Sequence, residues 1–198
     1  MFNTDWHIKI HEHYLSNFEK TGVFVLDDCF ATADLLALQS ESGLIDYQQA
    51  HLTNGERLSN IRGDSIRWID ENCTIGTHYL TSIEKLGEFF NHTFFAGIQR
   101  AEAHYACYTA GFGYDWHTDN PKGRDERVIS AVFYLNDNWT DADGGHIHVV
   151  DKTEKTQILT PRANRLVVFD SNLLHKVAIT HKTRFSIATW LRRDTGIW

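Results

Sequence analysis

The sequence predicts an α+β fold in which a jelly roll or β-sandwich is backed by N-terminal helices. Near the start of the chain, the apolar residues Trp6, Ile10, Tyr14 and Phe18 recur at the period of a helix. From Gln99 onward, short segments rich in Val, Ile, Tyr and Phe alternate with turn residues. Many short strands after a helical first half are typical of an α+β protein with a two-sheet core.

The elements of the first half are bounded by residues that favour helix ends and turns. We expect, in order, a helix over residues 5–20, a buried strand over 23–26, a helix capped by Thr32 or Asp34 and running to about Ser40, an extended piece over 65–68, and a helix over 81–92. The last helix is placed by Thr81 and Glu84, which have the spacing of a capping box.

The second half reads as a succession of strands. They are expected over residues 100–108, 128–135, 146–150, 156–160, 165–169, 175–179 and 184–191. Turns are marked by Asp143-Gly144-Gly145 and by Asn164. No repeat, linker or low-complexity tract divides the chain. We therefore predict one domain over residues 1–198, with helical support and a substrate loop in 1–98 and a jelly-roll core carrying a metal site in 99–198.

Composition excludes some classes of function. The net charge is −7 and the basic residues form no tract, which argues against nucleic acid as a partner. The first 20 residues contain no apolar run, so we expect neither a signal peptide nor a membrane span. Cys29, Cys73 and Cys107 are widely spaced and form no CxxC pair. This pattern indicates a reducing compartment and predicts a cytoplasmic protein.

Three residues suggest a metal site. His117, Asp119 and His175 are two imidazoles and one carboxylate, the ligand set of the facial-triad Fe(II) oxygenases. Each has an ordinary alternative: the HxD string could be a surface turn, and His175 could be a core or edge histidine. Zinc is the second choice of metal, although no thiolate or fourth ligand is evident. The pairs His11/His13 and His146/His148 are interpreted as surface or structural histidines.

Strand alternation gives Arg184 a particular setting. Arg184, Ser186, Ala188 and Trp190 fall on one face of the predicted last strand. An arginine that shares a face with small residues and a tryptophan fits a cavity better than a solvent-facing surface. There the guanidinium would meet a carboxylate in two parallel hydrogen bonds, and Ser186 could add a hydroxyl donor.

Several strings in the same order resemble one enzyme family. They are Asn60 to Ile69, Ala106-Cys107-Tyr108, His117-Thr118-Asp119-Asn120-Pro121, Phe133-Tyr134-Leu135-Asn136, Gly144-Gly145, and Arg184 to Trp190. The chain resembles the 2-oxoglutarate/Fe(II) prolyl hydroxylases, in particular those that act on hypoxia-inducible factor and their bacterial relatives. The resemblance implies a double-stranded β-helix core. It also implies Fe(II), 2-oxoglutarate and O₂ as cofactors or co-substrates, with ascorbate as a reductant.

The resemblance also implies roles for individual residues. His117, Asp119 and His175 would hold Fe(II), and Arg184 would pair with the far carboxylate of 2-oxoglutarate. The rest of the co-substrate pocket would consist of Tyr134, Tyr108, Ser186 and Ile147, and the substrate side would consist of Trp190, Arg127, Arg62 and Asp64.

The predicted function is hydroxylation of a prolyl residue in a protein or peptide, with translation-related proteins as one candidate class of partner. Two alternatives stay open: a hydroxylase of a free amino acid or small metabolite, and a non-catalytic metal-dependent sensor or binding module. Residues 48–62, centred on Asn54-Gly55, could be a hairpin that closes over a peptide or an ordinary surface loop. Because the last predicted strand is followed only by a short stretch to Trp198, we expect the helix that the resembled family uses around its substrate to be missing.

Overall fold

Two antiparallel sheets lie at the centre of the structure, a computed structural model that describes residues 2–50, 62–120 and 123–194. The larger sheet has the strand order β1-β9-β6-β11-β4-β3-β2, and the smaller has the order β5-β10-β7-β8. The strands are β1 (Val23–Leu26), β2 (Gln48–Gln49), β3 (Asp64–Trp68), β4 (Arg100–Tyr108), β5 (Tyr114–His117), β6 (Arg127–Tyr134), β7 (Ile147–Val150), β8 (Thr156–Leu159), β9 (Leu166–Asp170), β10 (His175–Val177) and β11 (Arg184–Arg192).

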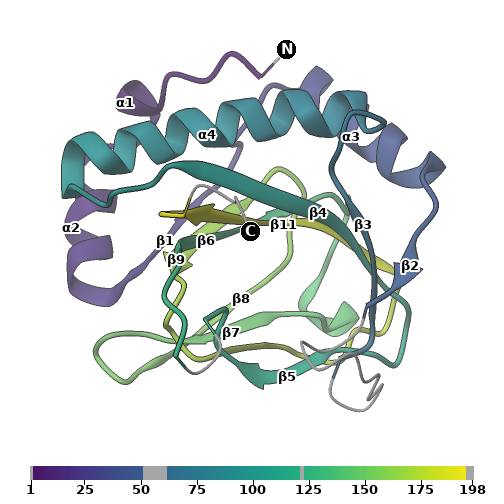
Figure 1. The fold of residues 1–198 in the computed structure, drawn as a ribbon. Coiled ribbons are helices and arrows are strands. Elements are labelled where there is room, and N and C mark those ends of the chain that lie inside the picture. The colour runs from purple at the N-terminus through teal and green to yellow at the C-terminus, as the bar shows by residue number, and fades with distance from the viewer. Residues whose placement is uncertain (1, 51–61, 121–122, 195–198) are drawn as a thin grey trace.

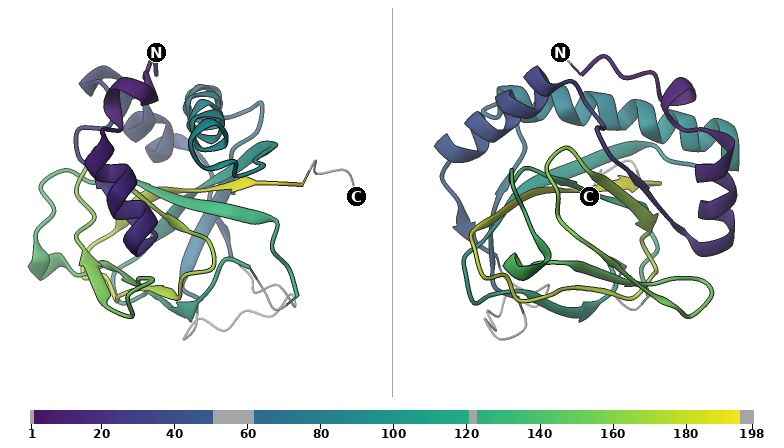
Figure 2. Two further views of the ribbon diagram at one scale, coloured as in Figure 1. Left: turned by 90° about the vertical axis from the view of Figure 1, so that its left-hand side faces the viewer. Right: turned by 180° about the vertical axis from the view of Figure 1, so that it is seen from behind.

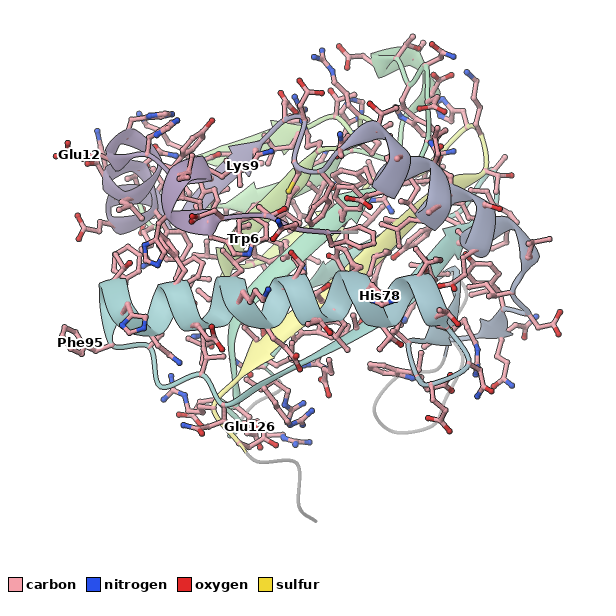
Figure 3. The ribbon with its side chains drawn as sticks, turned by 90° about the horizontal axis from the view of Figure 1, so that it is seen from above. Trp6, Lys9, Glu12, His78, Phe95 and Glu126 are labelled. Atoms are coloured by element: carbon pink, nitrogen blue, oxygen red, sulfur yellow. The ribbon has the colours of Figure 1, made fainter. Side chains whose placement is uncertain are left out.

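The helices cover one face of the larger sheet, and the smaller sheet faces its other side (Figures 1 and 2). They are α1 (Trp6–Lys9), α2 (Glu12–Thr21), α3 (Thr32–Leu44) and α4 (Thr74–Phe94), with a 3-10 turn, η1 (Asp141–Asp143), in the second half. The long helix α4 runs across the sheet, and Trp6 of α1 lies beside it (Figure 3); the Trp6 indole N–H donates to the Ser82 carbonyl at 2.8 Å. This arrangement is the predicted jelly-roll core with N-terminal helical support.

The two faces of β11 have different surroundings, as the alternation of its side chains predicts. Ile187 packs in the main hydrophobic core together with α4 residues such as Ile83 and Leu86. Thr189, on the same face, forms a hydrogen bond with the Tyr79 hydroxyl of α4 at 3.1 Å. The opposite face of β11 therefore looks away from the helices and toward the space between the two sheets.

The first predicted helix is interrupted. Residues 5–20 form α1 and α2 rather than one helix, because Ile10 is extended (φ −98°, ψ 96°) and His11 takes the N-cap position of α2. Ile10 is 3% exposed, so the break lets its side chain enter the core. The predicted cap of α3 was also wrong: the N-cap is Ala31, and the Asp34 carboxylate instead accepts a hydrogen bond from the Phe2 backbone N–H.

The predicted start of α4 was wrong by two turns. The helix begins at Thr74 rather than near Thr81, and the Thr81 hydroxyl donates to the Thr77 carbonyl one turn back. The Glu41 carboxylate of α3 accepts the backbone N–H groups of Ile75 and Gly76 at 2.8 and 2.7 Å. A partner from a distant segment thus satisfies the first turn, which a search for local capping residues does not detect.

The predicted strands of the second half are confirmed to within about two residues at their ends, and the predicted turns are present. Gly144, Gly145 and Asn164 all have positive φ values. The sequence prediction missed β5, a four-residue strand at the edge of the smaller sheet, where it pairs with the three-residue β10. In the described part of the chain, no helix is both long and apolar enough to cross a membrane.

Candidate active site

Three predicted metal ligands converge between the two sheets. His117 ends β5 and His175 begins β10, and the two residues are direct partners in the pairing of these strands. Asp119 follows two residues after His117, and its backbone N–H donates to the Ser171 carbonyl at 3.1 Å. One ligand atom from each of the three side chains lies within 4.8 Å of the others. This spacing allows all three side chains to bind one ion.

Backbone carbonyls orient the two imidazoles. The Nδ1 atom of His117 lies 2.7 Å from the Asp115 carbonyl, and that of His175 lies 2.9 Å from the Leu173 carbonyl. A carbonyl can only accept, so each Nδ1 carries the proton and donates. Each Nε2 atom therefore keeps its lone pair for a metal, which is the arrangement that metal-binding histidines usually have.

The Asp119 carboxylate is held by Ser130, whose hydroxyl also contacts that of Ser171. The Ser130 hydroxyl donates to Asp119 Oδ2 at 2.5 Å, and the Ser171 hydroxyl lies 2.8 Å from that of Ser130. Burial raises the pKa of Asp119, but His175, His117 and the Ser130 hydrogen bond together lower it below its usual value. Burial also lowers the pKa of His117 to about 4. The site thus offers an ionised carboxylate and, at His117, a neutral imidazole at neutral pH.

This donor set fits a divalent metal ion. Two imidazoles and one carboxylate on one side of an ion are the protein ligands of the non-haem Fe(II) oxygenases, which keep the remaining positions open for substrates. Among the described residues, no other group of three His, Cys, Asp or Glu side chains could hold a metal. In particular, His146 lies 3.3 Å from Asp141 on the protein surface rather than in such a group.

Arg184 is a buried cation without an acidic partner in the described part of the chain. Its side chain is 1% exposed, and its Nη1 donates to the Ser186 hydroxyl at 3.0 Å. Its guanidinium lies 4.9 Å from the centre of the Tyr134 ring and 5.2 Å from that of Tyr108. The Arg184 Nε and the Tyr134 hydroxyl find no hydrogen-bond partner in good geometry among the described residues. An uncompensated buried charge is costly, so this end of the site fits an anionic ligand.

One cavity of about 470 Å³ joins the ligand cluster to Arg184. Its walls include His117, Asp119, His175, Arg184, Tyr108, Ser186, Ile147, Trp190, Arg127, Arg62 and Asp64. Tyr134 is fully buried beside Arg184 and is not part of the cavity wall. The structure therefore brings the predicted site residues into one region, with Tyr134 positioned to reach the same ligand as Arg184.

Of the residues predicted for the substrate side, Trp190 lies six residues along β11 from Arg184 and Arg127 lies beside it, whereas Asp64 pairs with Tyr108, the direct partner of Arg184. The Arg127 guanidinium stacks 3.8 Å from the centre of the Trp190 ring and also donates to Glu102 at 2.9 Å. Arg62 Nε donates to Asp64 at 2.8 Å. Most of the predicted 48–62 hairpin lies outside the described residues; only its ends are described, as β2 and as Arg62, which bridges to Tyr114.

Sequence reasoning missed several cavity residues. Tyr114 stacks on His117 with 3.6 Å between ring centres, and Trp68 and His104 line the substrate side. A usable signal was present for His104, because it lies four residues before Tyr108 on the same strand and therefore on the same face. Tyr114 gave no such signal, since the strand that carries it was not predicted.

Comparisons with known proteins agree with this geometry. The model of the 2OG-Fe(II) oxygenase superfamily matches residues 103–192. The human prolyl hydroxylase EGLN3 is 32% identical over 187 residues, which cover 89% of this chain and 76% of that protein. The match to mouse Egl nine homolog 1 is 30% identical and covers 90% of this chain and 48% of the relative.

The chain belongs to the prolyl hydroxylase family of 2-oxoglutarate/Fe(II) oxygenases. This family consists of 2-oxoglutarate-dependent Fe(II) dioxygenases. The fold class and the enzyme class predicted from the sequence are therefore confirmed. Among solved structures, a Pseudomonas putida prolyl-4-hydroxylase is 29% identical, covers 92% of this chain and 98% of that one, and has a TM-score of 0.84. A Trichoplax adhaerens prolyl hydroxylase has a TM-score of 0.86 at 22% identity over 99% of this chain and 98% of that one, and it shares the oxygenase fold.

Proposed function

We propose that this protein hydroxylates a prolyl residue in a protein or peptide. In the overall reaction, 2-oxoglutarate and O₂ are converted to succinate and CO₂, and one oxygen atom enters a C–H bond of the substrate as a hydroxyl group. The observation that carries the proposal is the single cavity that joins the His117–Asp119–His175 cluster to the buried Arg184. The similarity to proteins named prolyl hydroxylases supports the choice of substrate.

We assign the residues of the cavity to two roles, metal binding and 2-oxoglutarate binding. His117, Asp119 and His175 would hold Fe(II), which supplies the oxidising chemistry when it is bound. Arg184 would pair with the distal carboxylate of 2-oxoglutarate, and the hydroxyls of Ser186 and Tyr134 would donate to the same group. Ile147 and Tyr108 would form the walls that exclude water around the co-substrate.

The substrate would approach from the opposite end. Trp190 offers a large apolar face there, and Arg127 keeps that ring in place by stacking on it at 3.8 Å. Arg62 and Asp64 form an ion pair in the wall of the same cavity. We assign these four residues to the substrate side, where a prolyl ring could pack against the indole while its C–H bond faces the metal cluster.

The reaction is tested by incubating the purified protein with Fe(II), 2-oxoglutarate and a cell extract, and then mapping oxygen additions by mass spectrometry. We expect succinate and hydroxylated prolyl residues from the wild type and neither from His117→Ala. Oxygen additions confined to free amino acids or other metabolites would replace the peptide substrate with the small-molecule alternative. Additions only on residues other than proline would exclude prolyl hydroxylation while leaving the oxygenase assignment intact.

Three finer points belong to the same proposal. We propose ascorbate as the reductant that keeps the iron in the Fe(II) state, a cytoplasmic location, and translation-related proteins as one class of candidate substrate. The location is supported by Cys29, Cys73 and Cys107, all of which are free thiols. Omission of ascorbate should lower the number of turnovers. Mapping of hydroxylated residues in cells with and without the gene tests the substrate class.

A further inference from the structure

His104 is a buried histidine on the cavity wall that neither the metal cluster nor the 2-oxoglutarate end uses. It lies on β4, is 3% exposed, and lines the cavity near Trp68 and Trp190. The His104 ring centre is 5.1 Å from that of Trp68 and 5.3 Å from that of Trp190. A polar ring between two indoles is an unusual choice, because an apolar side chain would pack there without a desolvation cost.

The surroundings of His104 decide which of its nitrogens can meet a ligand. Nδ1 lies 3.2 Å from the Tyr105 carbonyl, and because a carbonyl only accepts, Nδ1 carries the proton. Nε2 is then an acceptor, and it makes no hydrogen bond to any described residue. Burial lowers the pKa of His104 to about 4; the Asp64 carboxylate opposes this shift, and the Arg62 and Arg127 guanidinium groups add to it. The imidazole is therefore neutral at neutral pH and suits a hydrogen-bond donor rather than an anion.

The register of the larger sheet gives the approximate separation of His104 from Ser130, the residue that holds Asp119. His104 pairs with Ala188 of β11, and Ala188 pairs with Val132 of β6. Ser130, which holds Asp119, is two residues from Val132 on the same strand. Two strand spacings across the sheet and two residues along β6 separate His104 from Ser130 by roughly 12 Å, and successive Cα atoms of a peptide are about 3.8 Å apart. His104 is thus within reach of groups one to three residues from the atom that is oxidised.

We propose that His104 is a specificity-determining residue whose Nε2 accepts a hydrogen bond from an N–H group of the substrate next to the ring that is hydroxylated. This inference rests on the proposed function and deepens it. A prolyl residue within a chain has no N–H, so in a peptide the donor is the amide of an adjacent residue. In free proline the donor is the ring ammonium. The two sources share one chemistry and are separated by the experiment.

The test uses three small probes: N-acetylproline N-methylamide, the methyl ester of N-acetylproline, and free L-proline. The amide and the ester differ only in the N–H that follows the ring. The measurements are kcat and KM for succinate formation that is coupled to hydroxylation of each probe. We expect the wild type to prefer the amide over the ester by about tenfold in kcat/KM, because one acceptor in a largely buried wall is left unpaired by the ester.

Three variants assign that preference to His104. In His104→Leu the ratio between amide and ester should fall to about one, chiefly through KM for the amide. In His104→Gln, whose side-chain carbonyl can replace Nε2, part of the preference should return. The matched control is His148→Leu, which removes a histidine of β7 that does not line the cavity, and it should keep the wild-type ratio.

The outcomes separate this inference from the proposed function. An amide preference in His104→Leu as large as in the wild type would overturn the role of His104. A wild type that turns over both the amide and the ester without preference would overturn it as well, whether or not the variants fold. Turnover of free L-proline alone would refute the peptide substrate. His104 is then judged on that probe: a tenfold loss in kcat/KM with His104→Leu supports the inference, and an unchanged value refutes it.

Discussion

Gly145 lies so close to Arg184 that a β-carbon added to it would be 2.9 Å from the Arg184 Cδ. Gly145 also has a φ of +65°, a conformation that side chains disfavour. The turn before β7 therefore packs directly against the Arg184 side chain, whose guanidinium group we assign to 2-oxoglutarate binding. This contact explains why the second residue of the Gly144-Gly145 string is a glycine.

Gly145→Ala should weaken 2-oxoglutarate binding, because the new methyl group would displace the Arg184 side chain. We expect KM for 2-oxoglutarate to rise by about tenfold, the equivalent of about 1.4 kcal/mol, together with a lower melting temperature from backbone strain. The matched control is Gly97→Ala, which has a φ of +71° and no atom within 4 Å of the new carbon. It should lower stability without changing KM, and an equal rise in KM for both variants would contradict this explanation.

Tyr134→Phe should affect binding and stability in different directions. The Tyr134 hydroxyl is buried without a well-formed hydrogen bond in the described structure, so its removal should leave the free energy of unfolding unchanged or higher. The same change removes a donor to the proposed carboxylate site, so the affinity for 2-oxoglutarate should fall about tenfold. Calorimetric titration and urea denaturation measure the two effects. Unchanged affinity would remove Tyr134 from the co-substrate site.

Ser130→Ala should weaken metal binding without removing a ligand. The Ser130 hydroxyl donates to Asp119 at 2.5 Å, and loss of such a support typically lowers metal affinity about ten- to a hundredfold. Fe(II) titration under anaerobic conditions gives the affinity. The control is Ser82→Ala, which removes a buried hydroxyl of α4 that has no hydrogen-bond partner among the described residues. Equal Fe(II) affinities in wild type and Ser130→Ala would show that Asp119 is oriented without this serine.

The sequence predicted the site better than it predicted some of the elements that carry it. Alternation along one strand was enough to place Arg184 and Trp190 on a common face, because residues that are an even number of positions apart on a strand point to the same side. His117 was identified from its HxD string although its strand, β5, was not predicted. Four residues that include Asp115 and follow a glycine carry too little strand signal of their own, and their pairing partner is 58 residues away in the sequence.

Features that depend on distant partners could not be read from local patterns. The start of α4 is set by Glu41, 34 residues before Ile75, so a search for a local cap favoured Thr81 instead. The break at Ile10 reflects burial of its side chain in a core formed by the rest of the chain. Tyr114 became visible as a cavity residue only when β5 was in place beside β10.

Glu41→Gln should destabilise the fold while leaving the site intact. The Glu41 carboxylate accepts hydrogen bonds from Ile75, Gly76 and the Tyr105 hydroxyl. An amide has only one acceptor oxygen, so at least one buried donor loses its partner, at a cost of about 1–3 kcal/mol. Urea denaturation should show this loss, and KM for 2-oxoglutarate should not change. The exposed residue change Glu71→Gln is the control, and a similar loss there would refute the capping role.

Acid should destabilise the metal-free protein through its buried histidines. The pKa values of His104 and His117 are lowered from 6.5 to about 4, in each case chiefly by burial. As the pH falls below 6.5, the unfolded chain binds protons that the folded chain does not, so the free energy of unfolding falls until the pH reaches about 4. For His104 the full loss is up to about 3 kcal/mol. Urea denaturation with a chelator present, between about pH 7 and about pH 4.5, measures it.

The variant His104→Gln isolates one of the two contributions, because it removes the titrating ring while keeping a polar side chain. Its stability should fall less steeply with decreasing pH than that of the wild type over the same range. Asp119 does not disturb this comparison: its lowered pKa gives stability that is present above pH 3.8 and is lost only at lower pH. An equally steep fall in His104→Gln would show that His104 does not remain neutral in the folded protein.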